Sequence, residues 1–160
     1  MFAWLSWGWE LLKVGDAAPD FSVAASDGTT VQLKNYLGKG PVVLYFYPKD
    51  DTPGCTKEAC GIRDDFSEFK GLNATVFGVS FDSAESHQKF ITKYKLPFVL
   101  LADTDKKVAV AYGAAGSNSL VPSRVTFVID AQGKIVRVFP KVSPAEHSAE
   151  LRQALTELRK

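Results

Sequence analysis

The stretch that decides the fold is residues 45–60, YFYPKDDTPGCTKEAC. It begins at the end of an apolar run, Val42 to Tyr47, whose length and lack of charge predict a buried strand. It then crosses a turn-rich segment and enters a helical pattern, in which Ile62, Phe66 and Phe69 repeat at helical spacing. The stretch therefore predicts a strand, a loop and an amphipathic helix in direct succession.

The start of this helix follows from local chemistry. Thr52 is a suitable N-cap, and Pro53 suits the first helical position, where its missing N–H costs nothing. Cys55 then falls in the first turn, near the positive end of the helix dipole and its free N–H groups. Both favour the thiolate, which is the nucleophile. We therefore expect Cys55 to be an exposed, reactive cysteine on a helix that stops at Gly71.

The second cysteine, Cys60, lies five residues further along the same predicted helix. Five helical residues give a rise of about 7.5 Å and a turn of about 140°. The two Cα atoms would then be about 9 Å apart, beyond the ~7 Å limit for a disulfide. A Cys55–Cys60 bond therefore requires the first turns of the helix to unwind.

These residues carry a resemblance to a known family. The pattern P-x-x-x-T-x-x-C, filled by Pro48, Thr52 and Cys55, resembles the active-site signature of peroxiredoxins. The longer run FYPKDDTPGCTKEAC is similar to the Q-type subfamily, the bacterioferritin comigratory proteins, and the likeness extends from about Lys13 to the C-terminus. It implies a thioredoxin-like fold and a thiol peroxidase that needs no metal, haem or flavin. Cys55 would be the peroxidatic cysteine and Cys60 the resolving one, with a hydroperoxide as substrate and thioredoxin or a similar dithiol as reductant.

The same resemblance gives roles to other residues. Thr52 would hydrogen-bond the peroxide and the thiolate, although it could simply cap the helix. Pro48 would shape the loop and shield the thiolate. Arg124 lies in the segment SRVTFVID, which resembles the family segment carrying a catalytic arginine, and a fixed cation would hold the thiolate ionised. Arg63, on the cysteine helix, is the competing candidate, but it could instead pair with Asp64.

The two histidines, His87 and His147, fall on helical patterns and are expected to be surface or half-buried residues without a catalytic role. With only two cysteines, not spaced as C-x-x-C, four good ligands for a structural metal are not in evidence.

The remaining pattern predicts an α/β fold with a mixed central β-sheet flanked by helices. Turns at Asp27-Gly28 and Gln132-Gly133 predict an N-terminal β-hairpin and a second hairpin near the C-terminus. Capping boxes are expected at Asp82 with Glu85, and at Ser143 with Glu146. The predicted strands are 21–24, 30–33, 42–47, 75–81, 98–101, 125–129 and 134–139, and further helices run to about residue 94, over 105–112, and through the C-terminus.

Composition bounds the remaining questions. A chain of 160 residues with 46% hydrophobic residues suits one domain, and a net charge of +1 gives no argument for nucleic acid. Two cysteines are too few for a disulfide-stapled secreted scaffold, so we expect a cytoplasmic protein, with a monomer favoured and a dimer possible.

Residues 1–12 form a separate feature, because they contain all three tryptophans and a single charge, Glu10. The run is too short to span a bilayer, lacks a basic start and lacks the basic face of an interfacial anchor. We expect a Trp-rich extension packed on the domain or on a neighbouring chain, followed by a single peroxiredoxin-like domain over residues 13–160.

Two other classes of function remain open. A thioredoxin-like disulfide oxidoreductase would be expected to have a C-x-x-C motif, which the chain lacks. A non-enzymatic redox sensor or binding protein could use the Trp-rich extension instead.

Overall fold

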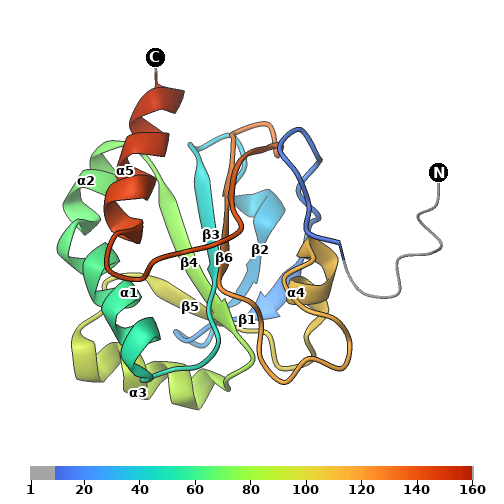
Figure 1. Ribbon diagram of the computed structural model, residues 1–160, viewed down its shortest axis with the longest axis vertical. Helices are drawn as coiled ribbons and strands as arrows, with labels where there is room; N and C mark the ends of the chain where they lie inside the picture. Colours follow the sequence, from blue (N-terminus) through green and yellow to red (C-terminus); the bar gives the residue numbers. More distant parts are fainter. Residues whose placement is uncertain (1–9, 160) are drawn as a thin grey trace.

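The computed structural model describes residues 10–159 and is built on a five-stranded mixed β-sheet (Figure 1). Its strand order is β5-β4-β3-β6-β7. Strands β3, β4 and β5 run parallel, β6 is antiparallel to β3, and β7 is antiparallel to β6. The strands are β3 (Val42–Phe46), β4 (Thr75–Ser80), β5 (Val99–Ala102), β6 (Val125–Ile129) and β7 (Ile135–Phe139). An N-terminal hairpin, β1 (Ser22–Ala24) with β2 (Thr30–Gln32), forms a separate antiparallel pair. The predicted mixed sheet and N-terminal hairpin are confirmed.

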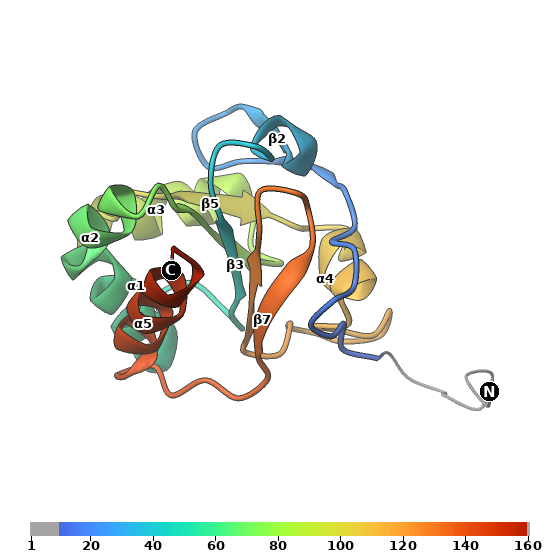
Figure 2. The ribbon, with the colours of Figure 1, turned by 90° about the horizontal axis from the view of Figure 1, so that it is seen from above.

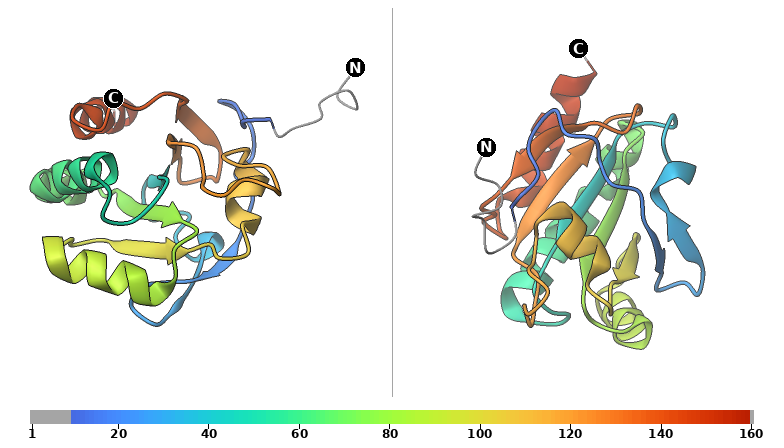
Figure 3. Two further views of the ribbon diagram at one scale, coloured as in Figure 1. Left: turned by 60° about the horizontal axis from the view of Figure 1, so that its bottom comes forward. Right: turned by 90° about the vertical axis from the view of Figure 1, so that its right-hand side faces the viewer.

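Helices cover the sheet on both faces. The helices are α1 (Pro53–Asp64), α2 (Phe66–Gly71), α3 (Ala84–Tyr94), α4 (Lys107–Tyr112) and α5 (His147–Leu158), with a 3-10 turn η2 (Leu33–Asn35). Helices α1, α2, α3 and α5 lie on one face, and α4 with the N-terminal hairpin lies on the other (Figures 2 and 3). Each face encloses its own hydrophobic cluster.

Strand β3 separates the two clusters and is buried on both sides. Val42, Leu44 and Phe46 point into the cluster beneath the hairpin and α4, whereas Val43 and Tyr45 point into the cluster beneath the other helices. Burying each such side chain contributes about 1.5–3 kcal/mol. The central strand therefore gives the loop that follows it a rigid starting point.

The predicted cysteine helix is two helices. The chain leaves α-helical geometry at Asp65, where φ is −102° and ψ is 11°, and α2 then runs to the predicted stop at Gly71. The Asp65 carboxylate accepts a hydrogen bond of 2.7 Å from the Ser148 hydroxyl and pairs with Arg152 at 3.3 Å, both on α5. Contacts with a distant helix mark this break, and local sequence patterns do not report them.

Two predicted capping boxes are wrong. Helix α3 is capped by Ser83, whose Oγ accepts from the Ser86 N–H at 3.1 Å, whereas the Asp82 carboxylate accepts from the Asp50 N–H. Helix α5 begins at His147, because Ser143 and Glu146 close a separate turn through a backbone bond of 3.0 Å. At the first place a loop contact uses the Asp82 carboxylate, and at the second a separate turn comes before the helix.

The described part of the N-terminal extension contacts the domain. Leu11 and Leu12 pack partly against the hydrophobic cluster beneath the hairpin, and the Leu12 N–H donates to the Tyr112 carbonyl at 3.2 Å. The three tryptophans lie outside the described residues, so the Trp-rich extension and the domain boundary after residue 12 stay predictions. Across residues 10–159, none of the helices combines the length and apolar character that crossing a bilayer demands.

Candidate active site

The loop between β3 and α1 ends at Thr52, which occupies the predicted N-cap position, and Pro53 is the first helical residue. The Thr52 side chain makes no capping bond; its hydroxyl instead donates to the Lys49 carbonyl at 2.9 Å. Cys55 is the third residue of α1, so its thiol lies within the first helical turn, where the helix dipole favours negative charge. Pro48, the first residue of the predicted signature, is half-buried in the bend after β3.

Cys55 is buried rather than exposed, which corrects the prediction. Its residue is 1% exposed, because it belongs to the hydrophobic cluster beneath α1. A charge that forms in a site with little water interacts more strongly with fixed neighbours than it would in bulk solvent. Little water is therefore available around this sulfur to screen a neighbouring charge.

Arg124 provides such a charge. Its Nη2 donates to the Cys55 Sγ at 3.3 Å. The sheet explains the approach: Phe46 at the end of β3 pairs with Val125 at the start of β6, so the residue before β6 lies beside the loop after β3. Gly54 leaves room for it, because a Cβ there would lie 3.1 Å from the Arg124 Nη2. The structure thus brings together two residues that are 69 positions apart in the sequence.

Glu58 is the residue that the sequence analysis missed. Its Oε1 accepts from the Arg124 Nη1 at 2.7 Å, and its side chain is 0% exposed. Burial raises the pKa of Glu58 to about 7, although the Arg124 guanidinium acts in the opposite direction. The spacing of three residues from Cys55 puts both side chains on one face of α1, and this signal could have identified it. Glu58 and Cys55 thus accept hydrogen bonds from the two terminal nitrogens of one guanidinium, Nη1 and Nη2.

His147 lies behind Glu58 and is fully buried, which corrects the prediction of a surface or half-buried histidine. Its Nε2 lies 2.7 Å from the Thr126 hydroxyl and 3.9 Å from the Glu58 Oε2. Burial lowers the pKa of His147, the Glu150 carboxylate at 3.3 Å opposes this, and the Arg124 charge adds to the lowering. These surroundings favour a neutral ring, which would accept from the Thr126 hydroxyl at Nε2 and donate its Nδ1–H to Glu150.

Cys60 lies on the same uninterrupted helix as Cys55, and both thiols are free. Cys60 is half-buried. A continuous helix separates the two Cα atoms by about 9 Å, so a disulfide cannot form without a change in α1.

Arg63 does not approach the cysteine cluster. It pairs with Asp64 at 3.0 Å, and its Nη1 donates to the Tyr94 carbonyl at 2.7 Å. Of the two candidate arginines, the structure therefore places Arg124 at the thiol and Arg63 at a helix contact.

Within residues 10–159, one group of side chains has the arrangement of a possible metal site, namely Asp50, Asp82 and His87, whose ligand atoms lie within 4.8 Å of one another. His87 is fully buried, which also corrects its prediction. Side-chain or backbone donors already bind the Asp50 and Asp82 carboxylates, and the His87 Nε2 lies 2.9 Å from the Leu101 carbonyl. This geometry satisfies the cluster without a metal ion.

A family model and the sequences of known proteins both match this chain, and they point to the same family. The model of the AhpC/TSA family matches residues 14–138. Peroxiredoxin Bcp of Bacillus subtilis is 42% identical over 153 residues, which cover 92% of this chain and 97% of that protein. A putative peroxiredoxin bcp of Helicobacter pylori is 47% identical over 152 residues, covering 91% of this chain and 99% of that protein.

Solved structures agree with the sequence comparisons. Peroxidoxin BcpB from Mycobacterium tuberculosis has a TM-score of 0.86 at 36% identity and covers 93% of this chain and 99% of its own. A mutant of Xylella fastidiosa PrxQ has a TM-score of 0.87 at 30% identity, with coverage of 94% and 99%. The expected thioredoxin-like fold is thereby confirmed. The chain belongs to the AhpC/TSA family as a peroxiredoxin of the Bcp and Q type, and it is a thiol-dependent peroxidase.

Proposed function

We propose that Cys55 is the peroxidatic cysteine and Cys60 the resolving cysteine of this peroxidase. The observation that carries the proposal is the 3.3 Å hydrogen bond from the Arg124 Nη2 to the Cys55 Sγ, at the first turn of a helix. A guanidinium is a permanent cation, and one fixed beside a buried sulfur favours the thiolate over the thiol. Glu58 orients the guanidinium through its own bond to Nη1.

The first step is attack by the Cys55 thiolate on the terminal oxygen of a hydroperoxide. A sulfur–oxygen bond forms, the oxygen–oxygen bond breaks, and the sulfur loses two electrons to become a sulfenic acid. The leaving hydroxide or alkoxide takes up a proton and departs as water or an alcohol. Arg124 offers fixed positive charge as negative charge moves onto the leaving oxygen, and we propose that the Thr52 hydroxyl, at the N-cap of α1, orients the peroxide.

The second step closes a disulfide. The first turns of α1 unwind, the Cys60 thiolate attacks the Cys55 sulfur, and hydroxide leaves and is protonated to water. Helix ends are among the least costly places for local opening, and the new bond offsets part of the cost. The helix therefore alternates between a folded form that reacts with peroxide and an open form that resolves the sulfenic acid.

The third step restores the dithiol. An external dithiol, with thioredoxin as the favoured donor, attacks the disulfide and leaves oxidised itself, by thiol–disulfide exchange. A cytoplasmic setting belongs to the same proposal, because thioredoxin keeps thiols reduced there. A monomer is the favoured state, since both cysteines of the proposed disulfide belong to one chain.

The proposal is tested by rapid mixing of the reduced protein with one equivalent of hydrogen peroxide, followed by mass spectrometry of digested peptides. Wild-type protein should lose two hydrogens in a Cys55–Cys60 cross-linked peptide. Cys60→Ser should stop at a Cys55 sulfenic acid formed at the wild-type rate, and Cys55→Ser should react no faster than a free cysteine. Equal oxidation rates in wild type and Cys55→Ser would show that Cys55 is not the peroxidatic residue.

A further inference from the structure

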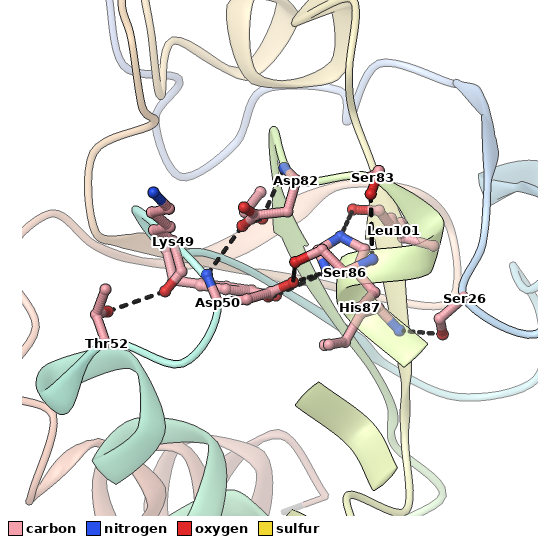
Figure 4. A network of polar contacts seen from close by, with 12 residues as sticks. Ser26, Lys49, Asp50, Thr52, Asp82, Ser83, Ser86, His87 and Leu101 are labelled. Carbon is pink, nitrogen blue, oxygen red and sulfur yellow. Dashed lines mark hydrogen bonds and ion pairs between the residues drawn. The ribbon is translucent and has the colours of Figure 1, made fainter. Parts of the chain in front are cut away.

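The loop between β3 and α1 is tied to the interior through Asp50. The Asp50 carboxylate, 5% exposed, accepts from the Tyr47 hydroxyl at 2.5 Å and from the Ser86 hydroxyl at 2.8 Å. Its backbone N–H donates to the Asp82 carboxylate at 2.9 Å. Figure 4 shows these contacts converging on Asp50 from α3 and from the end of β4, close to the Lys49–Thr52 contact.

His87 on α3 completes this cluster, and both of its ring nitrogens face acceptors. Its Nδ1 lies 2.7 Å from the Asp50 Oδ2, and its Nε2 lies 2.9 Å from the Leu101 carbonyl oxygen. The Tyr47 hydroxyl, 3.4 Å from Nδ1, already gives its proton to Asp50 and so presents only lone pairs. A neutral imidazole has one N–H and would leave one nitrogen lone pair against an acceptor oxygen. A ring with both nitrogens protonated satisfies every contact.

His147 provides a contrast within the same chain. One of its ring nitrogens faces the Thr126 hydroxyl, which can donate, and the other faces the Glu150 carboxylate, which accepts. A neutral ring satisfies both partners. Within hydrogen-bonding distance the two buried histidines therefore differ: His87 has acceptors at both ring nitrogens, whereas His147 has one possible donor and one acceptor, with the Glu58 Oε2 further away at 3.9 Å.

The loop that the cluster holds has a demanding backbone. Asp51 has a φ of 58°, a left-handed conformation that costs a residue with a side chain about 1–3 kcal/mol and persists only where the surroundings hold it. Outside the cluster, the Asp51 carboxylate accepts from Lys93 and Tyr94, each at 2.7 Å. Side chains of helix α3 thus bind two consecutive loop residues immediately before Thr52. The contacts with Asp50 are buried, and those with Asp51 are exposed.

We propose that His87 is a buried imidazolium paired with the Asp50 carboxylate, and that this ion pair positions the loop presenting Thr52 at the start of α1. His87 and Asp50 are then positioning residues that act on the reaction through Thr52. The effect on catalysis rests on the proposed function of Cys55 and Thr52, whereas the protonation of His87 does not. Besides its contact with the ring, the Asp50 carboxylate accepts hydrogen bonds from the Tyr47 and Ser86 hydroxyls, so its oxygens face donors only.

The protonation is tested by NMR of reduced, untagged, nitrogen-15-labelled protein at neutral pH. The chain has only two histidines, so single substitutions assign every ring signal. Long-range proton–nitrogen correlations should show two protonated nitrogens for His87 and one for His147. Two rings that each carry a single protonated nitrogen would overturn the imidazolium, and that result needs no assignment of the signals.

The positioning role is tested by Asp50→Asn, which keeps the shape of the side chain and removes its charge. Loss of the counter-ion should return His87 to a neutral ring and slow peroxide oxidation of Cys55 about tenfold, since small misplacements of a reacting group are costly. Glu85→Gln is the matched control, because it also removes one carboxylate charge, lies on α3 with His87, and concerns a side chain that is 79% exposed. Its oxidation rate should match wild type, and circular dichroism verifies that both variants are folded.

A double-mutant cycle separates positioning from general damage. If Asp50 and His87 act as a pair, Asp50→Asn combined with His87→Gln should be about as slow as either single variant, whereas independent defects would multiply. Wild-type oxidation by the Asp50→Asn variant would overturn the positioning role. Slow oxidation of the wild type itself would instead refute the proposed function, leaving the NMR result on His87 to be judged separately.

Discussion

At the scale of single residues, Arg124 is the positive charge that contacts the reactive sulfur. Its guanidinium contacts both the Cys55 sulfur and the buried Glu58 carboxylate. We expect Arg124→Ala to slow the oxidation of Cys55 by about a hundredfold, the usual effect of removing one donor from developing charge. Stopped-flow fluorescence with hydrogen peroxide measures this rate.

Arg63→Ala is the matched control, because it removes the same kind of side chain from the cysteine helix itself without touching the thiol. Arg63 bonds to Asp64 and to the Tyr94 carbonyl rather than to the thiol. Its variant should keep the wild-type rate of initial oxidation. A larger defect in Arg63→Ala than in Arg124→Ala would reverse the assignment of the two arginines.

Glu58 makes folding stability depend on pH. Its pKa is raised from 4.5 to about 7 in the folded protein, chiefly because burial disfavours the charged form. Between these two values the folded state keeps a proton that the unfolded state releases, so this residue's contribution to stability is present at low pH and is lost as pH rises toward 7. The loss amounts to about 3 kcal/mol across the interval.

Glu58→Gln should remove this pH dependence of the unfolding free energy while keeping an oxygen that accepts from Arg124. Urea unfolding at a series of pH values from 4.5 to 8 gives the two curves. The difference in unfolding free energy between variant and wild type should grow in favour of the variant as pH rises. Two parallel curves would mean that the buried carboxyl titrates at its ordinary value.

At the scale of elements, sequence patterns located helices and strands well and misplaced their ends. The residues of β6 were predicted as observed, since a run of apolar residues between polar turns is a local signal. The break at Asp65 and the start of α5 at His147 depend on side chains brought in by folding, such as Ser148. The burial of Cys55, Glu58 and both histidines likewise follows from packing between the helices and the sheet. A local sequence pattern contains no information on such packing.

Helix α1 is the element whose opening the mechanism requires, and Gly61 lies within it just beyond Cys60. A Cβ at residue 61 would meet only the Ser148 Cβ at 3.7 Å, an ordinary contact. Gly61→Ala should therefore stabilise the helix by about 1 kcal/mol. If residue 61 is part of the segment that opens, the fraction of molecules with an open helix should fall roughly fivefold. The Cys55 sulfenic acid should live longer and convert more readily to sulfinic acid under excess peroxide.

Mass spectrometry of the sulfinic product across a peroxide series measures this sensitivity. Gly71→Ala is the matched control, because Gly71 ends α2 and a Cβ there would meet nothing within 4 Å. It should leave the sensitivity at the wild-type level. If both variants are overoxidised at the same peroxide concentration as the wild type, the opening of α1 does not limit the rate of disulfide formation.

At the scale of the whole molecule, the sheet brings the separate parts of the site together. The antiparallel pairing of β3 with β6 delivers Arg124 to the cysteine helix, and α5 packs its first residues behind Glu58. The sequence predicted Cys55, Cys60, Thr52, Pro48 and Arg124 because they fall in recognisable patterns. It did not predict Glu58 or the Asp50–His87 cluster, whose members become neighbours only in the folded chain.

The oxidised molecule should be less stable than the reduced one. Opening the start of α1 exposes Cys55, Glu58 and Ala59, which the reduced fold buries. A disulfide across five residues constrains the unfolded chain only weakly compared with long loops. Calorimetry of reduced protein and of protein oxidised by one equivalent of peroxide should show a lower Tm for the oxidised form. A higher Tm after oxidation would mean that the disulfide fits the folded helix.

Helix α1 is folded in the reduced protein, and we propose that it is partly unwound in the disulfide form. Hydrogen exchange of the amides of residues 54–64, measured in both redox forms, tests it most directly. In the reduced protein the amides from Thr56 onward should be protected, because Thr56 makes the first helical hydrogen bond, and in the oxidised protein protection should be lost from Thr56 to about Cys60, with β3 unchanged. Equal protection of residues 54–64 in the two forms would contradict it, because Cys60 would then have to reach Cys55 without any opening of the helix.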